Sequence, residues 1–204
     1  MYIPKHFEKT DKKAIAEFIT KNSFAIVTSI IDEKPWASHI PMEMEINSEG
    51  KWFLHGHLAK ANPQANALQN GMEVLAIFTG PHAYISSGWY EKANVPTWNY
   101  LAVHVYGKVK INTNEELYRQ LTSMVAHHEQ NMDLPQQVEK MPVDMVNSHM
   151  KAIVGFTLEV TAIQGKWKLS QNRNDTDYKN VIAELEKLSE YDSKDIATEM
   201  KNHR

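Results

Sequence analysis

Alternating apolar and polar residues predict β-strands along most of the chain. Residues 24–31 form a short run rich in β-branched side chains, and residues 36–46 alternate like a strand with one buried face. The same signals predict further strands at residues 52–58, 73–78, 82–86, 98–111 and 153–161. Strands of this spacing, joined as hairpins, predict an antiparallel barrel.

Sequence patterns typical of helices lie between these strands and after them. Residues 11–22 place their apolar side chains on one face, behind a cap at Asp11. Residues 62–71 have the cap, the proline and the terminal glycine of a short helix, and Thr113–Glu116 is a capping box for a longer one. Further helices are predicted to begin at Pro142 and to span residues 175–189 and 194–202. The predicted fold class is therefore mainly β with α decoration (α+β).

Composition limits the classes of function. The 204-residue chain has no cysteine, which excludes disulfides, thiolate ligands and a cysteine nucleophile. No apolar stretch reaches the ~18 residues of a membrane span, and the N-terminus lacks the apolar core of a secretory signal. We therefore expect a cytoplasmic protein. The formal net charge of −3 does not indicate nucleic-acid binding, which would need a local basic patch.

The most informative stretch is residues 55–64, where a predicted strand ends and a helix begins. Backbone N–H groups at a helix start are unpaired and carry the positive end of the helix dipole. Lys60 stands just before that start and adds a full positive charge. The pattern predicts a site for a phosphate monoester. The alternative is an ordinary strand–helix junction with a solvated lysine.

Histidines and aromatic residues offer two further candidates. His55 and His57 share one face of a predicted strand, a spacing that could chelate a metal. Because no third ligand is apparent nearby, we predict no metal site. Aromatic residues at 89–90 and 98–100 could line a slot for a flat ligand or belong to a core. The chain has no Gly-rich phosphate loop, nucleophile elbow or HExxH motif, which disfavours a hydrolase.

Five segments, taken in order, carry a resemblance to a known family. They are Tyr2–Phe7, His57–Gln64, Gly80–Ser86, Val95–Tyr100 and Gly165–Arg173. With these motifs the chain resembles the PaiB-type FMN-binding negative transcriptional regulators, a branch of the pyridoxamine 5′-phosphate oxidase-like proteins. The resemblance implies an antiparallel split β-barrel of the FMN-binding type. We expect this domain at residues 1–173, with residues 174–204 as a helical extension packed on the barrel.

The resemblance also implies FMN as the cofactor, bound at the interface of a homodimer. It assigns the flavin phosphate to the segment that contains His55, Gly56, His57, Lys60 and Asn62. It places the isoalloxazine ring beside an earlier strand, here His39, Ile40, Pro41 and Met42. A C-terminal segment reaches the flavin from the second subunit, and its counterparts here are Trp167, Lys168, Gln171 and Arg173.

The chain departs from the oxidases at two positions. The oxidases carry an arginine in the flavin-flanking strand and another beside the phosphate-site lysine, whereas this chain has His39 and Ala59 near those points. Fewer fixed positive charges imply weaker flavin retention, and oxidation of pyridoxamine phosphate is not inferred. The function implied is a negative transcriptional regulator that responds to flavin. The alternatives are an FMN-dependent oxidoreductase and a haem-binding or haem-degrading protein.

The charge of the two C-terminal helices argues against direct DNA binding. The two C-terminal helices have the form of a helix-turn-helix, yet residues 174–204 carry eight acidic and five basic side chains. An element that faces DNA neutralises phosphates with Lys or Arg. We therefore expect an amphipathic helix pair packed on the barrel. DNA as a partner follows only from the resemblance, with Lys108, Lys110, Lys166, Lys168 and Arg173 as candidates for a basic surface.

Overall fold

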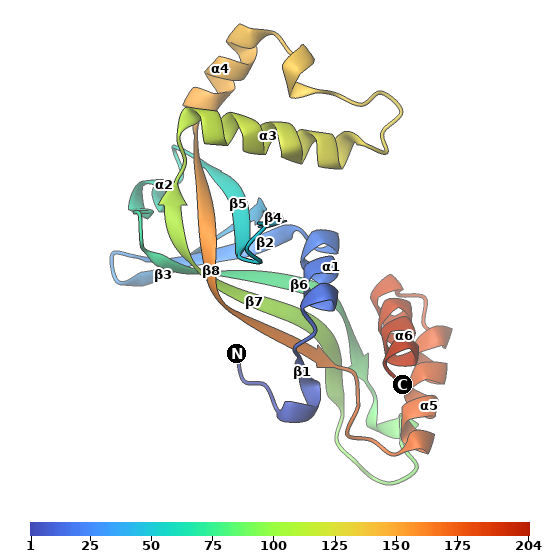
Figure 1. The fold of residues 1–204 in the computed structure, drawn as a ribbon. Helices are drawn as coiled ribbons and strands as arrows, with labels where there is room; N and C mark the ends of the chain where they lie inside the picture. Colours follow the sequence, from blue (N-terminus) through green and yellow to red (C-terminus); the bar gives the residue numbers. More distant parts are fainter. The chain divides into compact units, whose positions relative to one another are not determined.

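A computed structural model describes all residues, 1–204, and contains one eight-stranded sheet and six α-helices (Figure 1). The strands are β1 (Glu8–Lys9), β2 (Phe24–Ile31), β3 (Lys34–Pro41), β4 (Glu43–Ile46), β5 (Trp52–Ala59), β6 (Glu73–Ile85), β7 (Thr97–Ile111) and β8 (Ile153–Lys168). The helices are α1 (Lys12–Lys21), α2 (Pro63–Ala67), α3 (Asn114–Glu129), α4 (Val143–Lys151), α5 (Asp175–Lys187) and α6 (Tyr191–His203). None of the helices is both long and apolar enough to cross a membrane.

The chain forms two compact units. The barrel unit comprises residues 19–77 and 105–163, and the terminal unit comprises residues 1–18, 78–104 and 164–204. Strands β6, β7 and β8 contribute residues to both units. The strand order of the whole sheet is β3-β2-β6-β7-β8-β5-β4, and β1 pairs with β8.

The barrel unit holds the curved part of the sheet. β2 pairs antiparallel with β3 and β6, and β5 pairs antiparallel with β4 and β8. β3 also contacts β5, so the sheet curls back on itself. Alternate residues of each strand fill the interior, as the period of two requires: Ala25, Val27, Leu54, Leu58, Phe156 and Leu158 are all buried. Helix α3 packs beside α4 and lies over Gly155 of β8, where an added Cβ would meet Leu117 at 2.7 Å.

The terminal unit packs the helix pair α5–α6 on a smaller apolar core. Tyr178, Val181 and Leu185 of α5 are buried, together with Ile196 and Met200 of α6. The Tyr178 hydroxyl donates to the Met200 carbonyl at 2.8 Å. The amphipathic interpretation of the two helices is thus confirmed at these positions.

The expected α+β class and antiparallel barrel are confirmed, but several element bounds differ from the prediction. The strand predicted at 36–46 breaks at Met42, whose N–H donates to the Ser23 carbonyl at 2.8 Å and whose side chain is buried. The strands predicted at 73–78 and 82–86 are one strand, β6. Gly80 allows close packing there, since a Cβ would lie 2.6 Å from the Phe18 ring. β8 runs beyond the predicted end at 161, and α2 ends at Ala67.

Candidate functional site

The junction between β5 and α2 carries the predicted phosphate segment. The N–H of Lys60 donates to the Ala152 carbonyl at 2.8 Å, and that of Asn62 donates to the Ala59 carbonyl at 2.9 Å. Asn62 caps the helix because its Oδ1 accepts from the Gln64 N–H at 2.9 Å. With five residues and these partners, α2 offers few free N–H groups. Anion binding here would therefore depend on side chains.

Side-chain hydrogen bonds fix this junction to the neighbouring strands. Asn62 Nδ2 donates to Ser38 Oγ of β3 at 2.8 Å. Gln64 is fully buried, and its Nε2 donates to the Val27 carbonyl at 3.1 Å and to Ser29 Oγ at 3.0 Å. The Lys60 side chain is exposed and forms no ion pair with a carboxylate of the chain. The turn therefore holds a free ammonium near a fixed amide and a hydroxyl.

The residues predicted to flank the flavin ring point to opposite faces of the sheet, some buried and some exposed. Ile40 and Met42 are buried, and both lie against Gly56, where a Cβ would stand 2.5 Å from Met42 Sδ. His39 is exposed on the other face of β3, with its ring 6.2 Å from that of Phe24. Ile40, Met42 and Gly56 thus pack against one another in the barrel, whereas His39 projects outward. Pro41 closes β3 opposite Phe24.

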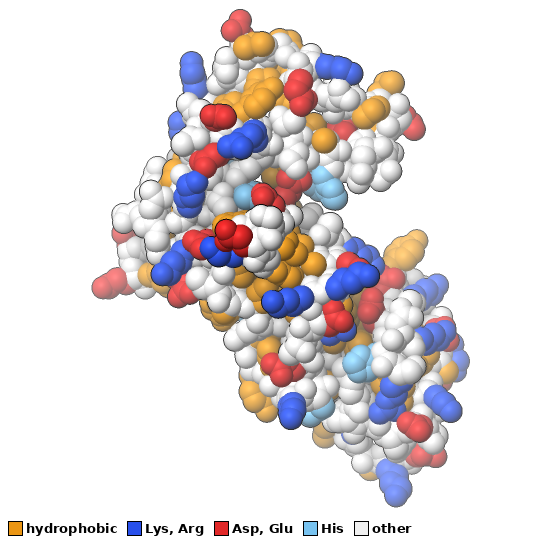
Figure 2. All heavy atoms as spheres, viewed as in Figure 1, with side chains coloured by type: hydrophobic (Ala, Val, Ile, Leu, Met, Phe, Trp, Pro, Cys, Tyr) orange, Lys and Arg blue, Asp and Glu red, His pale blue; other side chains and the backbone are white.

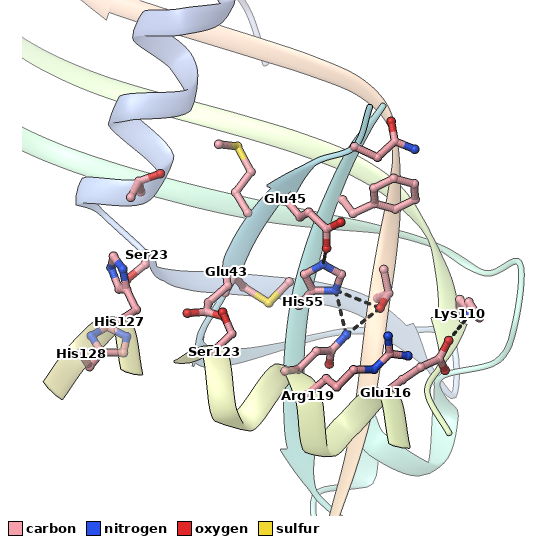
Figure 3. Close-up of a pocket in the computed structure, with 17 residues that line it drawn as sticks. Ser23, Glu43, Glu45, His55, Lys110, Glu116, Arg119, Ser123, His127 and His128 are labelled. Carbon is pink, nitrogen blue, oxygen red and sulfur yellow. Dashed lines mark hydrogen bonds and ion pairs between the residues drawn. The ribbon is translucent and has the colours of Figure 1, made fainter. Parts of the chain in front are cut away.

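His57 and His55 share the outer face of β5, as their spacing predicts, but differ in their surroundings. Burial lowers the pKa of His57, which keeps its imidazole neutral near pH 7. His55 instead belongs to a hydrogen-bond network (Figure 3). Its Nε2 donates to Glu45 Oε2 at 2.9 Å, because its Nδ1 accepts from Gln120 Nε2 at 2.8 Å.

The network joins β5 and β8 to helix α3. Gln120 Nε2 also donates to Thr157 Oγ1 at 3.0 Å, and Thr157 donates to Asn112 Oδ1 at 2.9 Å. Asn112 Nδ2 returns a hydrogen bond to Gln120 Oε1 at 2.6 Å. Every member of this cluster therefore has a partner within the chain.

The network forms one wall of a cavity of about 770 Å³ in the barrel unit. In the space-filling view the surface is hollowed below α3, with apolar, acidic and histidine side chains at its border (Figure 2). The close-up shows Glu43 and Ser123 facing each other from β4 and α3 (Figure 3). The full lining is Thr20, Ser23, Met42, Glu43, Met44, Glu45, Asn47, Phe53, His55, Lys110, Glu116, Arg119, Gln120, Ser123, His127, His128 and Thr157.

Ion pairing orders one end of this cavity. Lys110 Nζ bonds Glu116 Oε1 at 2.6 Å. This hydrogen bond, with one from the Thr113 backbone, lowers the pKa of Glu116 to about 2, so the carboxylate stays ionised. No residue of α3 was predicted to belong to a site. A stripe of polar residues at helical spacing could have indicated that this helix borders a cavity: Glu116, Gln120, Ser123 and His127.

The predicted C-terminal residues lie in the terminal unit, where each has its own partners. Trp167 is buried with its ring 5.0 Å from that of Phe18. Gln171 Oε1 accepts from the Leu169 N–H at 2.7 Å, and its Nε2 donates to the Trp167 carbonyl. Lys168 bonds Thr97 Oγ1 and the Trp98 carbonyl. A role of these three residues in flavin binding stays a prediction.

The donor set around Lys60 fits a phosphate monoester. A dianionic phosphate takes charge-assisted hydrogen bonds from an ammonium and neutral ones from amides and hydroxyls. Lys60, Asn62 and Ser38 supply these three kinds of donor within one turn and its neighbouring strand. No group of three or more His, Cys, Asp or Glu side chains is placed to hold a metal ion.

Two solved structures with a similar fold are flavin-binding proteins by name. The flavocytochrome Anf3 from Azotobacter vinelandii aligns with a TM-score of 0.61 at 13% identity, over 87% of this chain and 78% of that one. The FAD and haem binding protein from Mycobacterium smegmatis aligns with a TM-score of 0.60 at 14% identity, over 84% of this chain and 78% of that one. At such identities the likeness shows the fold alone, which is the split barrel expected from the sequence.

Similar sequences and a family model establish the family to which the chain belongs. The protease synthase and sporulation protein PAI 2 of Bacillus subtilis is 42% identical over 202 residues, which cover 99% of this chain and 97% of the relative. An uncharacterized protein of Emericella nidulans is 30% identical over 97% of this chain and 95% of its own length. A family model described as "Putative FMN-binding domain" matches residues 1–162. The chain therefore belongs to this family of FMN-binding domains, close to PAI 2, and its cofactor is FMN.

Proposed function

We propose that the protein is a homodimeric, flavin-responsive negative regulator of transcription that holds the FMN phosphate at the β5–α2 turn. The observation that carries the proposal is the hydrogen bond from Asn62 to Ser38, which fixes the Lys60 turn against β3. The likeness to PAI 2, named for protease synthesis and sporulation, supports a regulatory role.

The residues of the turn would make different contacts with the FMN phosphate. Lys60 contributes the positive charge, while Asn62 Nδ2 and Ser38 Oγ orient the phosphate oxygens. The neutral imidazole of His57 adds a donor or acceptor without further charge. His39 and the Phe24 ring flank the outer surface of β3, where a flat ring system can lie. Ser38 points to the other face of β3, so FMN would pass the edge of this strand, which is the first in the sheet order. FMN, when bound, supplies redox chemistry that the side chains of this chain lack.

Exposed apolar side chains on β2 support the homodimer. Phe24 is 64% exposed and Ile30 58%, and the register of β2 puts both on the same face of the hairpin. Large exposed apolar side chains on one face favour association with another protein surface. A second copy of the chain that covers this hairpin would also cover the outer surface of β3. Dimer and flavin site are then coupled.

Regulation in this proposal does not depend on a strong DNA-binding element. The α5–α6 pair uses its apolar face for packing and is acidic overall. Of the basic candidates, Lys166 is buried and Lys168 is bonded to Thr97 and Trp98. Flavin occupancy would act through another component of a cytoplasmic regulatory system.

The cavity below α3 favours a second candidate function, an FMN-dependent oxidoreductase. A volume of about 770 Å³ lies in the range of small-molecule sites. His55 lines this cavity, two residues from His57 of the flavin segment. An organic substrate in the cavity would therefore lie near β5, which both sites share.

The test combines spectra, titration and DNA binding on the purified full chain. We expect flavin absorbance bands after incubation with FMN, a dimer by light scattering, and only weak, salt-sensitive DNA binding in fluorescence anisotropy. A Soret band in place of flavin bands would contradict the proposal. Rapid turnover of NADH or NADPH by the flavin-loaded protein would establish the oxidoreductase instead. Nanomolar, sequence-selective DNA binding would show a basic surface that the chain assembles in the dimer.

A further inference from the structure

The cavity below α3 contains two charged side chains that have no partner within the chain. Glu43 of β4 and Arg119 of α3 both line this cavity, and neither forms an ion pair or a side-chain hydrogen bond with another residue. Lys110 already neutralises Glu116, the carboxylate on the turn of α3 just before Arg119. A free guanidinium and a free carboxylate are therefore available to a ligand in the same cavity.

Arg119 makes one end of the cavity suitable for a carboxylate. In the close-up its side chain extends toward the end that holds Glu116 and Lys110 (Figure 3). A guanidinium is always charged and can bind a carboxylate through two parallel hydrogen bonds. Because Lys110 and Glu116 cancel each other's charge, the positive charge of Arg119 dominates this end. It therefore favours the anionic group of a ligand.

The β4 wall of the cavity carries the opposite charge. Glu43 and Glu45 are alternate residues of β4, so their side chains leave the strand on the same face. Glu45 accepts a hydrogen bond from His55, whose imidazole is neutral because its other nitrogen accepts from Gln120, so this carboxylate keeps its negative charge. The close-up shows Ser123 of α3 facing Glu43, where its hydroxyl can accept a further hydrogen bond (Figure 3). This wall therefore favours an ammonium group.

The spacing of the two regions suits a dipeptide better than a free amino acid. Arg119 and Ser123 are four residues apart on α3, which is about 6 Å along the helix axis. Two extended residues span about 6–7 Å, whereas an α-amino acid carries its ammonium and carboxylate on one carbon. Phe53 lies opposite Glu45 in the strand register and offers an apolar contact beside the carboxylates. The volume of about 770 Å³ has room for such a ligand.

We propose that the cavity below α3 binds a dipeptide, with the peptide carboxylate on Arg119 and the peptide ammonium group on Glu43. An apolar side chain of the dipeptide contacts Phe53. The second candidate function also uses this cavity, but the inference does not rest on it, because binding of a dipeptide needs neither flavin nor turnover. None of the three residues belongs to the segments predicted to hold FMN.

Calorimetric titration of the full chain, with and without added FMN, tests this site. The probes are glycyl-leucine, its N-acetylated form, its C-terminal amide and free leucine. The acetylated form lacks the ammonium group and the amide lacks the carboxylate, so each loses one charge-assisted contact. We expect glycyl-leucine to bind about tenfold or more tightly than either capped form, and more tightly than leucine.

Two variants assign the charged contacts separately. Arg119→Met should weaken glycyl-leucine and its acetylated form by about tenfold or more and leave the amide unchanged, because the amide has no carboxylate. Glu43→Gln should weaken glycyl-leucine and the amide and leave the acetylated form unchanged. Lys151→Met on α4 and Glu115→Gln on α3 remove exposed charges outside the cavity, so these matched controls should change no affinity.

Several outcomes would overturn the proposal. No binding of glycyl-leucine at millimolar concentration would leave the cavity without this ligand, and leucine that binds as tightly would make the ligand an amino acid. Equal affinity for glycyl-leucine and both capped forms would remove the charged contacts. An equal loss for every probe in Arg119→Met and Glu43→Gln would show general damage to the cavity. Lys60→Ala should leave glycyl-leucine unchanged, so failure of the FMN phosphate site is distinguishable from failure of this one.

Discussion

The cavity wall of the barrel unit and the lysine pair of the terminal unit, Lys166 and Lys168 of β8, differ in how their polar groups are satisfied. In the cavity wall, His55 has Glu45 and Gln120, Thr157 has Asn112, and the ring of hydrogen bonds closes within the chain. Lys166 and Lys168 bond carbonyls and a hydroxyl and lie near ring faces, with no carboxylate partner. A closed network of side chains stabilises the fold, whereas a lysine without a counter-charge contributes little to it.

The largest effect expected from this difference is on stability in the barrel unit. Gln120→Ala should lower the free energy of unfolding by about 1–3 kcal/mol, because it leaves Asn112, Thr157 and His55 each short of a partner. Urea unfolding measures the loss. Gln130→Ala, at an exposed position just past α3, is the control and should change little. Unchanged stability in Gln120→Ala would show that water replaces the network at no cost.

A smaller effect is expected from pH. Burial lowers the pKa of His57 in the folded state, so the unfolded state binds more protons as the pH falls below about 6.5, the ordinary histidine value. His57 therefore contributes stability above that pH and loses it as the pH falls toward the lowered pKa. Unfolding at about pH 7.5 and about pH 5.5 should show a smaller loss for His57→Gln than for the parent chain. Equal losses would mean that His57 titrates normally.

The smallest effect on stability is expected from a substitution of Lys166. Lys166→Met replaces a buried ammonium that has no carboxylate partner with an apolar side chain of similar length. We expect a change in unfolding free energy within about 1 kcal/mol, because removing a buried charge offsets the lost hydrogen bond to the Tyr2 carbonyl. Lys179→Met, an exposed change on α5, provides the reference. A loss as large as that of Gln120→Ala would show that Lys166 is a structural member of its unit.

The sequence predicted strands and helix caps correctly where they depend on neighbouring residues. The strand at residues 24–31 has the predicted bounds, and the capping box Thr113–Glu116 forms as expected. Asn62 caps α2 as predicted, but the helix ends before Gly71. Gly71 instead adopts a φ of +83° and donates its N–H to the Val109 carbonyl, so the residue serves a turn outside the helix.

Features that depend on distant residues were not predictable in this way. The break at Met42 follows from a hydrogen bond to Ser23, and Gly80 allows the approach of Phe18 rather than a turn. The cavity needs β4, β5 and α3 together, although α3 lies far along the chain from both strands. The predicted strand ended at residue 161, so the sequence analysis did not show that Trp167 and Lys168 of β8 point to opposite faces.

Titration with FMN and riboflavin tests whether the FMN phosphate binds at Lys60. Both ligands carry the same ring system, but only FMN carries the phosphate. We predict that Lys60→Ala weakens FMN by about tenfold or more and leaves riboflavin nearly unchanged, since it removes one charge-assisted contact. Lys51→Ala, which removes an exposed lysine paired with Glu49 in the same unit, should change neither affinity. Equal losses for FMN and riboflavin, or no loss of FMN affinity in Lys60→Ala, would place the phosphate elsewhere.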